Sequence, residues 1–364
     1  MKRSIAVVGA GVVGAGTAWH LADRGHSVCL YDPRLAVAVD SGPNTTDRNG
    51  SSASLGVLMG NVYRRHSGRG WRLRQRSMAL WPQWIKAMQR FEPALQLDSP
   101  LIQLADDDDG LKRMQTLVER RQGLGLQLVP AMDEPVACIG GLCSERDGRL
   151  EPLVLQRALR LAMARVSVRT HPSKVLNLRR TGTNRCPRWG VETDGEDCRD
   201  YEAVVICTAL NSEALLAPLG HQRAMTPVLG QVIDLELKDG PADWTDWPAV
   251  LSLQGFNLVP QQPGRLLLGA TLEPGDQAQP RCLELMRSQL GSTLPWLRTA
   301  TPIEQWSGLR ARPVDRPAPL LEQLEPGLLL ASGHYRNGVL LAPATAEWVE
   351  TTLTDETAGS LSIS

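Results

Sequence analysis

The sequence predicts an α/β protein in which a Rossmann-like, doubly wound domain is joined to an α+β domain built on an antiparallel sheet. Three observations support this fold class: a glycine-rich strand–turn–helix pattern at the amino terminus, a second α/β stretch over residues 151–220, and hairpin patterning over 226–272. A chain of 364 residues is long enough for about two such domains.

The composition narrows the class of protein before any motif is considered. Lys and Arg number 39 and Asp and Glu number 39, so the net charge is zero and gives no global field to attract nucleic acid. No apolar run reaches the roughly 18 residues that a membrane span needs. The seven cysteines form no CxxC pair and no zinc-like cluster, which favours a reducing compartment. We expect a cytoplasmic protein, because patterned glycines and then Asp23 and Arg24 interrupt the signal-peptide-like start.

The first 32 residues read as one nucleotide-binding unit. Residues 5–8 (IAVV) are a buried strand, residues 9–14 (GAGVVG) match GxGxxG, and residues 15–24 form a helix that Gly25 ends. A second strand is expected over 26–31, and Asp32 follows it directly. Strand, glycine turn, helix, strand and acid in this order predict dinucleotide binding far more strongly than the glycines alone.

Each part of this unit has a mechanical role. Gly9 permits the tight turn, Gly11 lets a pyrophosphate approach the backbone, and Gly14 lets the helix pack closely on the strand. The helix amino end, with Val12 and Val13, offers free N–H groups to the phosphates. Asp32 can accept bonds from ribose hydroxyls and disfavours a 2′-phosphate, which argues against NADP. The motif does not separate FAD from NAD.

The next segments combine small residues with charge. Residues 41–56 form a loop in which Ser51, Ser52 and Ala53 could let the backbone come close to a ligand, or could belong to a plain surface loop. Residues 69–88 predict a helix with an apolar stripe. The basic stretch 64–76 at its start could contact phosphate or RNA, but we favour a solvated helix face. Residues 106–109 fail the spacing of a calcium loop and read as a solvated acidic loop, and we expect no metal site.

The second half of the chain supplies the remaining elements. A helix over 152–164 precedes strands over 166–170, 175–178 and 201–208. The last of these ends at Thr208 and Ala209, and ligands bind at the carboxyl ends of parallel strands. An alternating strand over 231–235 and a hairpin joining 257–260 to 265–271 form the antiparallel part.

Two arginine motifs mark the carboxyl-terminal region. They are Gly308-Leu309-Arg310 and the segment 333–338 (GHYRNG), which precedes a helix running through Trp348. Glycines flanking an arginine and an asparagine just before a helix favour backbone held close to a ligand, although loop arginines are more often surface residues. We expect residues 356–364 to form a flexible tail.

These motifs together resemble the FAD-dependent D-amino-acid oxidase superfamily, most of all its glycine-oxidase branch. The resemblance is carried by GAGVVGAG, GRGWRLRQRSMALW, NLVPQQPGRLLLGAT, GLRARPVD and GHYRNGVLLAPAT, in the family's order over residues 5–350. It implies a discontinuous FAD-binding domain of the glutathione-reductase type, formed by residues 1–75, 145–220 and 305–355. A substrate domain would comprise 76–144 and 221–304.

The resemblance also assigns roles to individual residues. The glycine loop would hold the FAD pyrophosphate, Asp32 the adenosine ribose, Val175 the adenine, and residues 51–53 would lie near the flavin. Arg310 would clamp the substrate carboxylate, and Arg336 would point towards the active site. The residues expected around the pyrimidine end of the flavin are His334, Tyr335, Arg336, Asn337, Gly338, Val339 and Leu340.

The chain departs from the family pattern at a few positions. Asn257 stands where glycine oxidases carry a tyrosine, Leu272 stands where a methionine is usual, and Arg312 is an unexpected cation. Asn257 could still donate a hydrogen bond in a wider pocket. With no cysteine near residues 308–316, we expect FAD to be non-covalent.

The implied activity is oxidation of a small amino acid or secondary amine acid such as glycine, sarcosine or a D-amino acid. Hydride would pass from the α-carbon to flavin N5, and dioxygen would reoxidise the flavin to give hydrogen peroxide. No side-chain base is required if the amine binds deprotonated. Two alternatives stay open: an FAD enzyme that modifies a tRNA wobble uridine, and a non-catalytic FAD-binding protein. An oligomer is possible.

Overall fold

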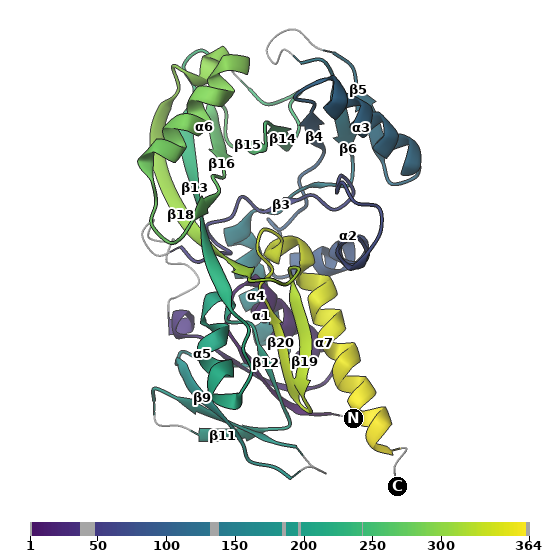
Figure 1. Cartoon of the computed structure of the whole chain (residues 1–364), viewed down its shortest axis with the longest axis vertical. Coiled ribbons are helices and arrows are strands. Elements are labelled where there is room, and N and C mark those ends of the chain that lie inside the picture. Colours follow the sequence, from purple (N-terminus) through teal and green to yellow (C-terminus); the bar gives the residue numbers. More distant parts are fainter. Residues whose placement is uncertain are drawn as a thin grey trace.

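The computed structural model describes residues 2–36, 48–131, 138–183, 187–195, 198–241 and 243–361, and it confirms the predicted α/β class. Figure 1 shows a lower part that holds both chain termini and an upper part built around a second, larger sheet. The element α2 (Arg69–Gln89) and the small sheet of β3 (Val57–Leu58) and β7 (Gly148–Arg149) lie between them. In the described residues, no helix is both long and apolar enough to cross a bilayer.

The lower part is built on a six-stranded sheet that is parallel except for its first strand. In spatial order its strands are β19 (Leu320–Glu325), β20 (Leu328–Ser332), β12 (Ala203–Ile206), β1 (Ser4–Val8), β2 (Ser27–Tyr31) and β8 (Arg169–His171). Strand β1 shows why the sheet is buried on both faces. Ile5 and Val7 pack into one core and Ala6 and Val8 into another, because successive side chains of a strand point to opposite faces.

Different elements cover the two faces of this sheet. Ile5 and Val7 share a core with α2 and with α1 (Val12–Asp23), α4 (Pro152–Arg165) and α7 (Gly338–Leu361). On the other face, Ala6 and Val8 share a core with α5 (Ser212–Leu216) and with a three-stranded antiparallel sheet. That sheet consists of β9 (Val175–Arg180), β10 (Trp189–Thr193) and β11 (Cys198–Tyr201).

The upper part is a nine-stranded mixed sheet. Helix α6 (Pro280–Thr293) packs Leu283, Met286 and Leu290 into one core of this sheet, and α3 (Asp108–Arg120) packs Met114 into another. The strands are β4 (Leu101–Leu104), β5 (Leu126–Val129), β6 (Gly141–Ser144), β13 (Met225–Glu236), β14 (Val250–Leu253), β15 (Phe256–Pro260), β16 (Arg265–Gly269), β17 (Glu273–Pro274) and β18 (Thr301–Pro313).

Strands β13 and β18 are much longer than the others and pair antiparallel along their length. In Figure 1 this ribbon runs from the upper sheet down towards the lower part. It therefore carries residues of the upper sheet to the edge of the nucleotide-binding unit. The predicted hairpin is present as β15 and β16, which pair from Asn257 with Gly269 to Pro260 with Leu266.

Several sequence expectations about elements were wrong in detail. Residues 106–109 are not a solvated loop, because the Asp107 carboxylate caps α3 by accepting from the Gly110 N–H and Asp108 and Asp109 occupy its first turn. The strand expected over 201–208 is divided, since β11 ends at Tyr201 and β12 begins at Ala203 in another sheet. The last described residue of α7 is Leu361, and residues 362–364 lie outside the described part.

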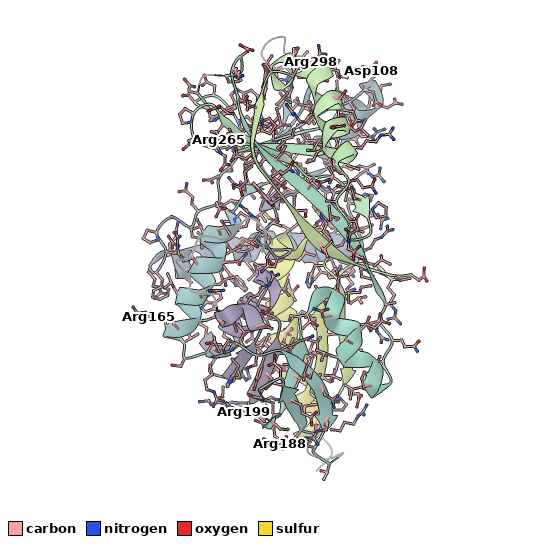
Figure 2. The ribbon with its side chains drawn as sticks, turned by 90° about the vertical axis from the view of Figure 1, so that its left-hand side faces the viewer. Asp108, Arg165, Arg188, Arg199, Arg265 and Arg298 are labelled. Atoms are coloured by element: carbon pink, nitrogen blue, oxygen red, sulfur yellow. The ribbon has the colours of Figure 1, made fainter. Side chains whose placement is uncertain are left out.

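The outer surface carries charges of both signs. In Figure 2, Arg165, Arg188 and Arg199 lie on the lower part, and Asp108, Arg265 and Arg298 on the upper part. The charged side chains are spread over both parts, in agreement with a net charge of zero.

Candidate active site

A cavity of about 1130 Å³ is lined by residues from both parts of the molecule. Its lining includes the β1–α1 loop, the loop before β3, strands β13, β15 and β18, and the start of α7. Small-molecule pockets usually measure about 300–1,000 Å³, so this cavity is large enough for an extended cofactor together with a small substrate.

The β1–α1 loop forms one wall of this cavity as a bare backbone cradle. Gly9 has φ +102°, and a Cβ there would lie 2.7 Å from the carbonyl oxygen of Cys207. At Gly14 a Cβ would lie 1.8 Å from the Gly9 carbonyl oxygen, so this glycine serves the packing of the turn and does not line the cavity. Gly11 begins α1 without a side-chain cap. A helix end of this kind offers backbone N–H groups and positive potential to a diphosphate.

Asp32 follows β2 at the same edge of the sheet and lines the cavity. Its Oδ2 accepts from the Ala10 N–H at 2.7 Å and its Oδ1 accepts from the Arg34 N–H at 2.9 Å. The carboxylate is thereby fixed beside the glycine turn. Carboxylate oxygens have about four lone-pair sites, so further acceptor capacity remains for ribose hydroxyls.

The loop over residues 48–53 closes over the helix end. The Ser51 hydroxyl accepts from the Val12 N–H at 3.0 Å, which joins this loop to α1. Asn49 holds the turn, since its Oδ1 accepts from the N–H groups of Ser51 and Ser52. Ser52 itself is buried and bonded within the turn, and it does not line the cavity, whereas Ser51 and Ala53 do.

Most of the cofactor residues expected from the sequence are brought together around this one cavity. Val175 begins β9, and Thr208 and Ala209 follow β12. The cofactor residues that line the cavity are Gly9, Gly11, Val12, Val13, Asp32, Ser51, Ala53, Val175, Thr208, Ala209, His334, Tyr335, Arg336, Asn337, Gly338, Val339 and Leu340.

The start of α7 is anchored from two sides. His334 is buried and its Nε2 lies 2.9 Å from the Thr345 hydroxyl, and burial, together with the nearby Arg69, lowers the pKa of His334 to about 3. This imidazole is therefore neutral at physiological pH. On the other side, the Trp81 indole N–H donates to the Leu340 carbonyl oxygen at 3.1 Å. The first turn of the helix, with its free N–H groups, is held against the cavity.

Arg310 projects from β18 into the same cavity. Its Nη1 donates to the carbonyl oxygens of Leu229 and Thr271, both at 3.1 Å, and its guanidinium lies so close over Gly230 that a Cβ there would be 2.2 Å away. Burial, with a smaller effect from Arg336, lowers the pKa of Arg310 to about 10, so the group is still a cation at neutral pH. Because the partners of its Nη1 are neutral carbonyl oxygens, the charge of Arg310 remains available to an anionic ligand.

Asn257 faces the cavity from β15. Its Oδ1 is buried and has no hydrogen-bond partner in the described structure. Leu272 and Arg312 do not line the cavity: Leu272 is 48% exposed, and the Arg312 guanidinium lies 5.9 Å from the ring centre of Tyr335. Of the three positions that differ from the family pattern, Asn257 therefore shapes the cavity directly, whereas Leu272 and Arg312 do not.

The sequence analysis missed several cationic and aromatic residues of the cavity. Arg48 pairs with Glu304 at 3.1 Å and stacks on Trp306. Arg74, which we expected on a solvated helix face, lines the cavity instead and donates to Asn337 Oδ1 at 2.8 Å. Tyr63 and Arg64 line it as well. The one available signal for Arg74 was its place in the basic stretch 64–76.

A buried carboxylate fixes the loop that leads to Tyr63. Asp147 accepts from the N–H groups of Gly60, Asn61 and Val62 and from the Asn61 side-chain amide, at 2.9 to 3.1 Å. Asp147 has no exposed surface. Because four donors converge on one carboxylate, this loop has a defined course where it meets the cavity.

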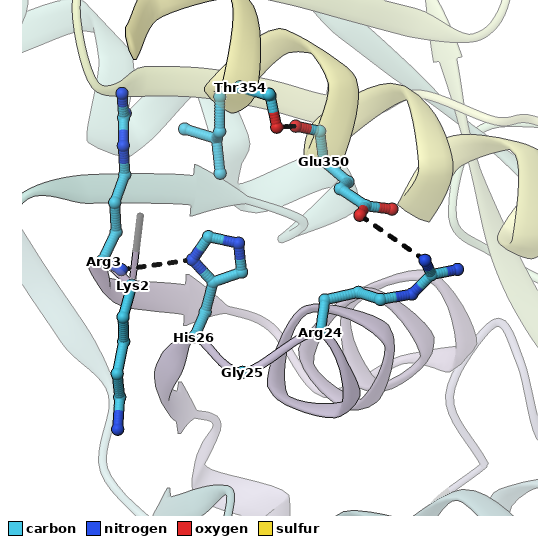
Figure 3. A pocket seen from close by; sticks show the side chains of 8 residues that line it. Lys2, Arg3, Arg24, Gly25, His26, Glu350 and Thr354 are labelled. Atoms are coloured by element: carbon cyan, nitrogen blue, oxygen red, sulfur yellow. Dashed lines mark hydrogen bonds and ion pairs between the residues drawn. The ribbon is translucent and has the colours of Figure 1, made fainter.

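A second, smaller cavity of about 360 Å³ lies beside the amino terminus (Figure 3). Two contacts join residues of its lining: Arg24 lies 3.8 Å from Glu350, and the backbone N–H of Arg3 donates to His26 Nδ1 at 3.3 Å. None of the residues expected at the functional site lines it.

Comparisons with known proteins agree with this geometry. A family model described as FAD dependent oxidoreductase matches residues 4–351. The glycine oxidase of Pseudomonas aeruginosa is 30% identical over 95% of this chain and 93% of its own length. The crystal structure of glycine oxidase from Geobacillus kaustophilus superposes with a TM-score of 0.80 at 25% identity, covering 97% of this chain and 95% of that one. FAD-bound L-α-glycerophosphate oxidase from Mycoplasma pneumoniae shares the fold, with a TM-score of 0.76 at 15% identity over 97% of this chain and 95% of that one.

Proposed function

This chain belongs to the FAD-dependent oxidoreductase family, and we propose that it oxidises the C–N bond of a small amino acid whose carboxylate binds Arg310. The observation that carries the proposal is the Arg310 guanidinium in the cavity, held by two backbone carbonyls and lacking a carboxylate partner in the described structure. A planar guanidinium binds a carboxylate through two parallel hydrogen bonds, which fixes the orientation of a small substrate.

The cradle around Gly9 and Gly11 fits the diphosphate of FAD, with Asp32 beside it for the adenosine ribose. When bound, FAD supplies the two-electron acceptor for the hydride that leaves the substrate α-carbon. The first turn of α7 directs its N–H groups and the positive end of the helix dipole at the cavity, where negative charge develops during the reaction.

The chain's own residues would bind and orient rather than transfer protons. Asp32 is the only carboxylic acid that lines the cavity within the described residues, and it is bonded beside the glycine turn. His334 is neutral and bonded to Thr345. Asn257 Oδ1 lacks a donor and can accept one N–H of the substrate amine, which orients the α-carbon once Arg310 holds the carboxylate. If the amine binds deprotonated, the orientation of the substrate and the electrostatics of the cavity then suffice for the hydride transfer, and no side-chain base is needed.

We further propose dioxygen as the electron acceptor. The overall reaction joins one amino acid, one dioxygen and one water to give a 2-oxo acid, hydrogen peroxide and an amine, which is ammonia for a primary amino acid and methylamine for sarcosine. Glycine, sarcosine and D-amino acids are the substrates to test first, because the curated relatives are named glycine oxidases.

The tRNA-modifying alternative has no specific observation in its favour. It rested on the basic stretch 64–76, in which Arg69 donates to carbonyl oxygens of Pro319 and Leu321, Arg74 lies in the cavity and Arg76 pairs with Glu347. These arginines are engaged within the chain.

The proposal is tested by substrate-dependent bleaching of the flavin without oxygen, followed by readmission of air and assay of peroxide. We expect Arg310→Met to retain FAD and to lose roughly 100-fold or more in kcat/KM for the best amino acid, because a buried charged partner is worth about 2–5 kcal/mol. Arg312→Met is the matched control, since it removes a cation two residues away on the same strand and outside the cavity. Equal bleaching of the Arg310→Met protein and the parent would show that the carboxylate binds elsewhere.

A further inference from the structure

The cavity carries more positive charge than its proposed ligands can neutralise. Its lining holds seven cationic side chains and one acid, Asp32. FAD brings a diphosphate, whose site we place at the glycine cradle, and a simple amino acid brings one carboxylate. Arg48 has a carboxylate partner in Glu304. The guanidinium groups of the lining that have no carboxylate partner in the described residues are those of Arg64, Arg74, Arg310 and Arg336.

Arg74 contacts an aromatic ring and an amide oxygen, but no acidic side chain in the described residues. It projects from α2, its guanidinium lies 4.0 Å from the ring centre of Tyr63, and its Nη2 donates to Asn337 Oδ1. Its Nε is buried and has no hydrogen-bond partner in the described structure. A partly buried guanidinium whose buried nitrogen lacks a hydrogen-bond partner costs free energy. Charged groups in such an environment are concentrated at functional sites, where a ligand can supply the missing partner.

Arg74 is not isolated from the proposed carboxylate clamp. Arg336 lies close enough to both Arg74 and Arg310 for its charge to lower the pKa of each of them. Arg336 and Arg64 line the same cavity, and neither has an acidic partner in the described residues. Arg310, Arg336 and Arg74 are therefore like charges that act on one another within one cavity, and mutual repulsion of this kind is relieved when anions bind between them.

We propose that Arg74, together with Arg336, forms a second anion subsite, and that the preferred substrate is a small amino acid bearing a second carboxylate. In this arrangement Arg310 binds the carboxylate next to the reacting carbon. The stack on Tyr63 and the bond to Asn337 hold the Arg74 guanidinium in one orientation, which lowers the entropy lost when a carboxylate binds. This inference rests on the proposed function, because it assumes that Arg310 binds the first carboxylate.

The first test compares non-oxidisable acids on the parent holoenzyme at constant ionic strength. Propionate, butyrate and valerate carry one carboxylate, and malonate, succinate and glutarate, which have the same chain lengths, carry two at increasing spacing. Binding is measured by calorimetry and by the change in flavin absorption. We expect at least one dicarboxylate to bind about tenfold or more tightly than the monocarboxylate of the same chain length, since a hydrogen bond to a charged group contributes enough for that ratio. Equal affinity at every length would overturn the inference.

Variants then ask whether Arg74 is responsible. Arg74→Met should lower the affinity for the best dicarboxylate about tenfold more than the affinity for its monocarboxylate, and Arg74→Lys should restore part of the preference because it keeps the charge. Arg76→Met is the matched control: Arg76 lies on the same helix but pairs with Glu347 outside the cavity, so both affinities should be unchanged. Loss of FAD from the Arg74→Met protein would instead assign the arginine to the cofactor and overturn the inference.

The same experiment separates this inference from the proposed function. If no carboxylate of either kind binds the parent, the clamp at Arg310 fails and the subsite fails with it. If monocarboxylates bind as tightly as dicarboxylates, the clamp stands and only the second subsite is wrong. As a check on turnover, iminodiacetate should exceed sarcosine in kcat/KM, and D-aspartate should exceed D-alanine. The opposite order in both pairs would contradict a preference for diacids.

Discussion

At the scale of single residues, the candidate site depends on positions where a side chain is absent as much as on those where one is present. Gly230 on β13 lies opposite Gly308 on β18, and the Arg310 guanidinium crosses directly over it. Gly9 and Gly11 leave backbone open to a diphosphate in the same way. The absence of a side chain at Gly230 therefore leaves room for the Arg310 guanidinium, which is the group proposed to bind an anion.

Gly230→Ala should displace the carboxylate clamp without unfolding the chain. The new Cβ would lie 2.2 Å from the end of the flexible Arg310 side chain, so the guanidinium must move while the strand keeps its course. We expect KM for the best amino acid to rise about tenfold, a loss of roughly 1.4 kcal/mol of binding, with FAD content unchanged. Steady-state kinetics measure this, and an unaltered KM would mean that the position of Arg310 is not critical.

The residue scale also shows what the sequence could and could not predict. The N-terminal cradle was predictable because strand, glycines, helix and Asp32 are contiguous, and local chemistry decides each of them. Arg74 was not predictable, because its burial depends on Asn337, which lies 263 positions away. For the same reason an unpaired Asn257 oxygen cannot be read from the hairpin that contains it.

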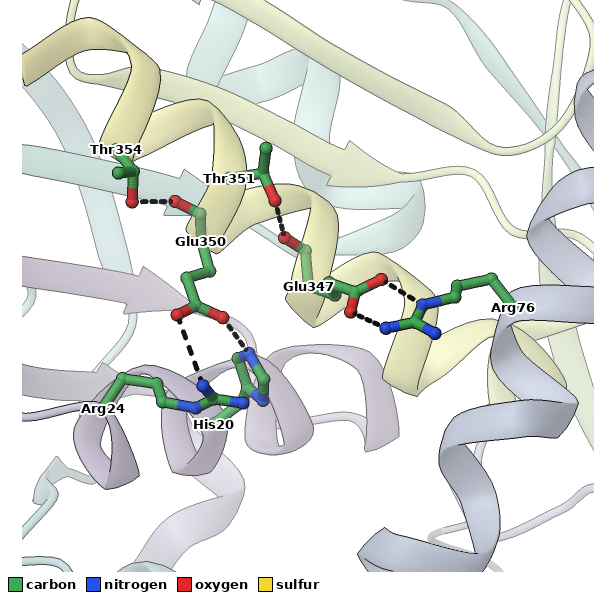
Figure 4. Close-up of polar contacts among 7 residues, drawn as sticks. All are labelled: His20, Arg24, Arg76, Glu347, Glu350, Thr351 and Thr354. Carbon is green, nitrogen blue, oxygen red and sulfur yellow. Dashed lines mark hydrogen bonds and ion pairs between the residues drawn. The ribbon is translucent and has the colours of Figure 1, made fainter. Parts of the chain in front are cut away.

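At the scale of elements, helix α7 connects the cavity to the rest of the lower part. Its first turn faces the cavity, and further along it packs against α1 and α2. Figure 4 shows the polar contacts of its outer half: Glu347 pairs with Arg76 of α2, and Glu350 pairs with Arg24 and His20 at α1. These polar contacts, two of them ion pairs with arginine, fix how the helix lies relative to its neighbours.

The Arg76–Glu347 pair predicts a specific pH dependence of stability. Hydrogen bonding from Arg76 lowers the pKa of Glu347 in the folded protein, so the pair stabilises the fold above the ordinary glutamate pKa of about 4.3. That stabilisation is lost as the pH falls through the lowered folded value. Because both side chains are partly exposed, we expect Arg76→Met to cost only about 0.5 kcal/mol at pH 7. The difference in melting temperature between the two proteins should shrink as the pH falls below the ordinary glutamate value, and a gap that does not change with pH would contradict this.

Elements were predictable where the pattern is local and uniform, as in α1, α2 and the β15–β16 hairpin. Pairing between distant segments was not. Strand β4 pairs parallel with β14, joining Leu101 to Val250, and nothing in either segment specifies its partner. The start of α3 was missed because four consecutive acids look like a solvated loop until the Asp107 carboxylate is seen to cap the helix.

At the scale of the whole molecule, the cavity is lined by both the lower and the upper part. The lower part contributes the glycine cradle to its lining, and the upper sheet contributes Arg310 and Asn257. A ligand that fills this cavity contacts both parts at once. Binding of the cofactor should therefore stabilise the whole chain and not only the nucleotide-binding unit.

Removal and return of FAD tests this. The melting temperature of the apoprotein should rise by about 3–4 °C at FAD concentrations 100-fold above Kd, because such binding contributes about 2.7 kcal/mol and a chain of 364 residues has a large unfolding entropy. ADP, which lacks the flavin, should give a smaller shift, and NAD should give less than FAD. A single calorimetric transition that moves as a unit is expected. An upper part that melts independently of added FAD would contradict the shared cavity.

The paired strands β13 and β18 also limit how the two parts of the molecule can move. Twelve residue pairs tie them together, and Arg310 lies within that span. A hinge motion between the lower and the upper part would have to bend this paired ribbon. We therefore expect the two parts to keep one relative orientation throughout the catalytic cycle.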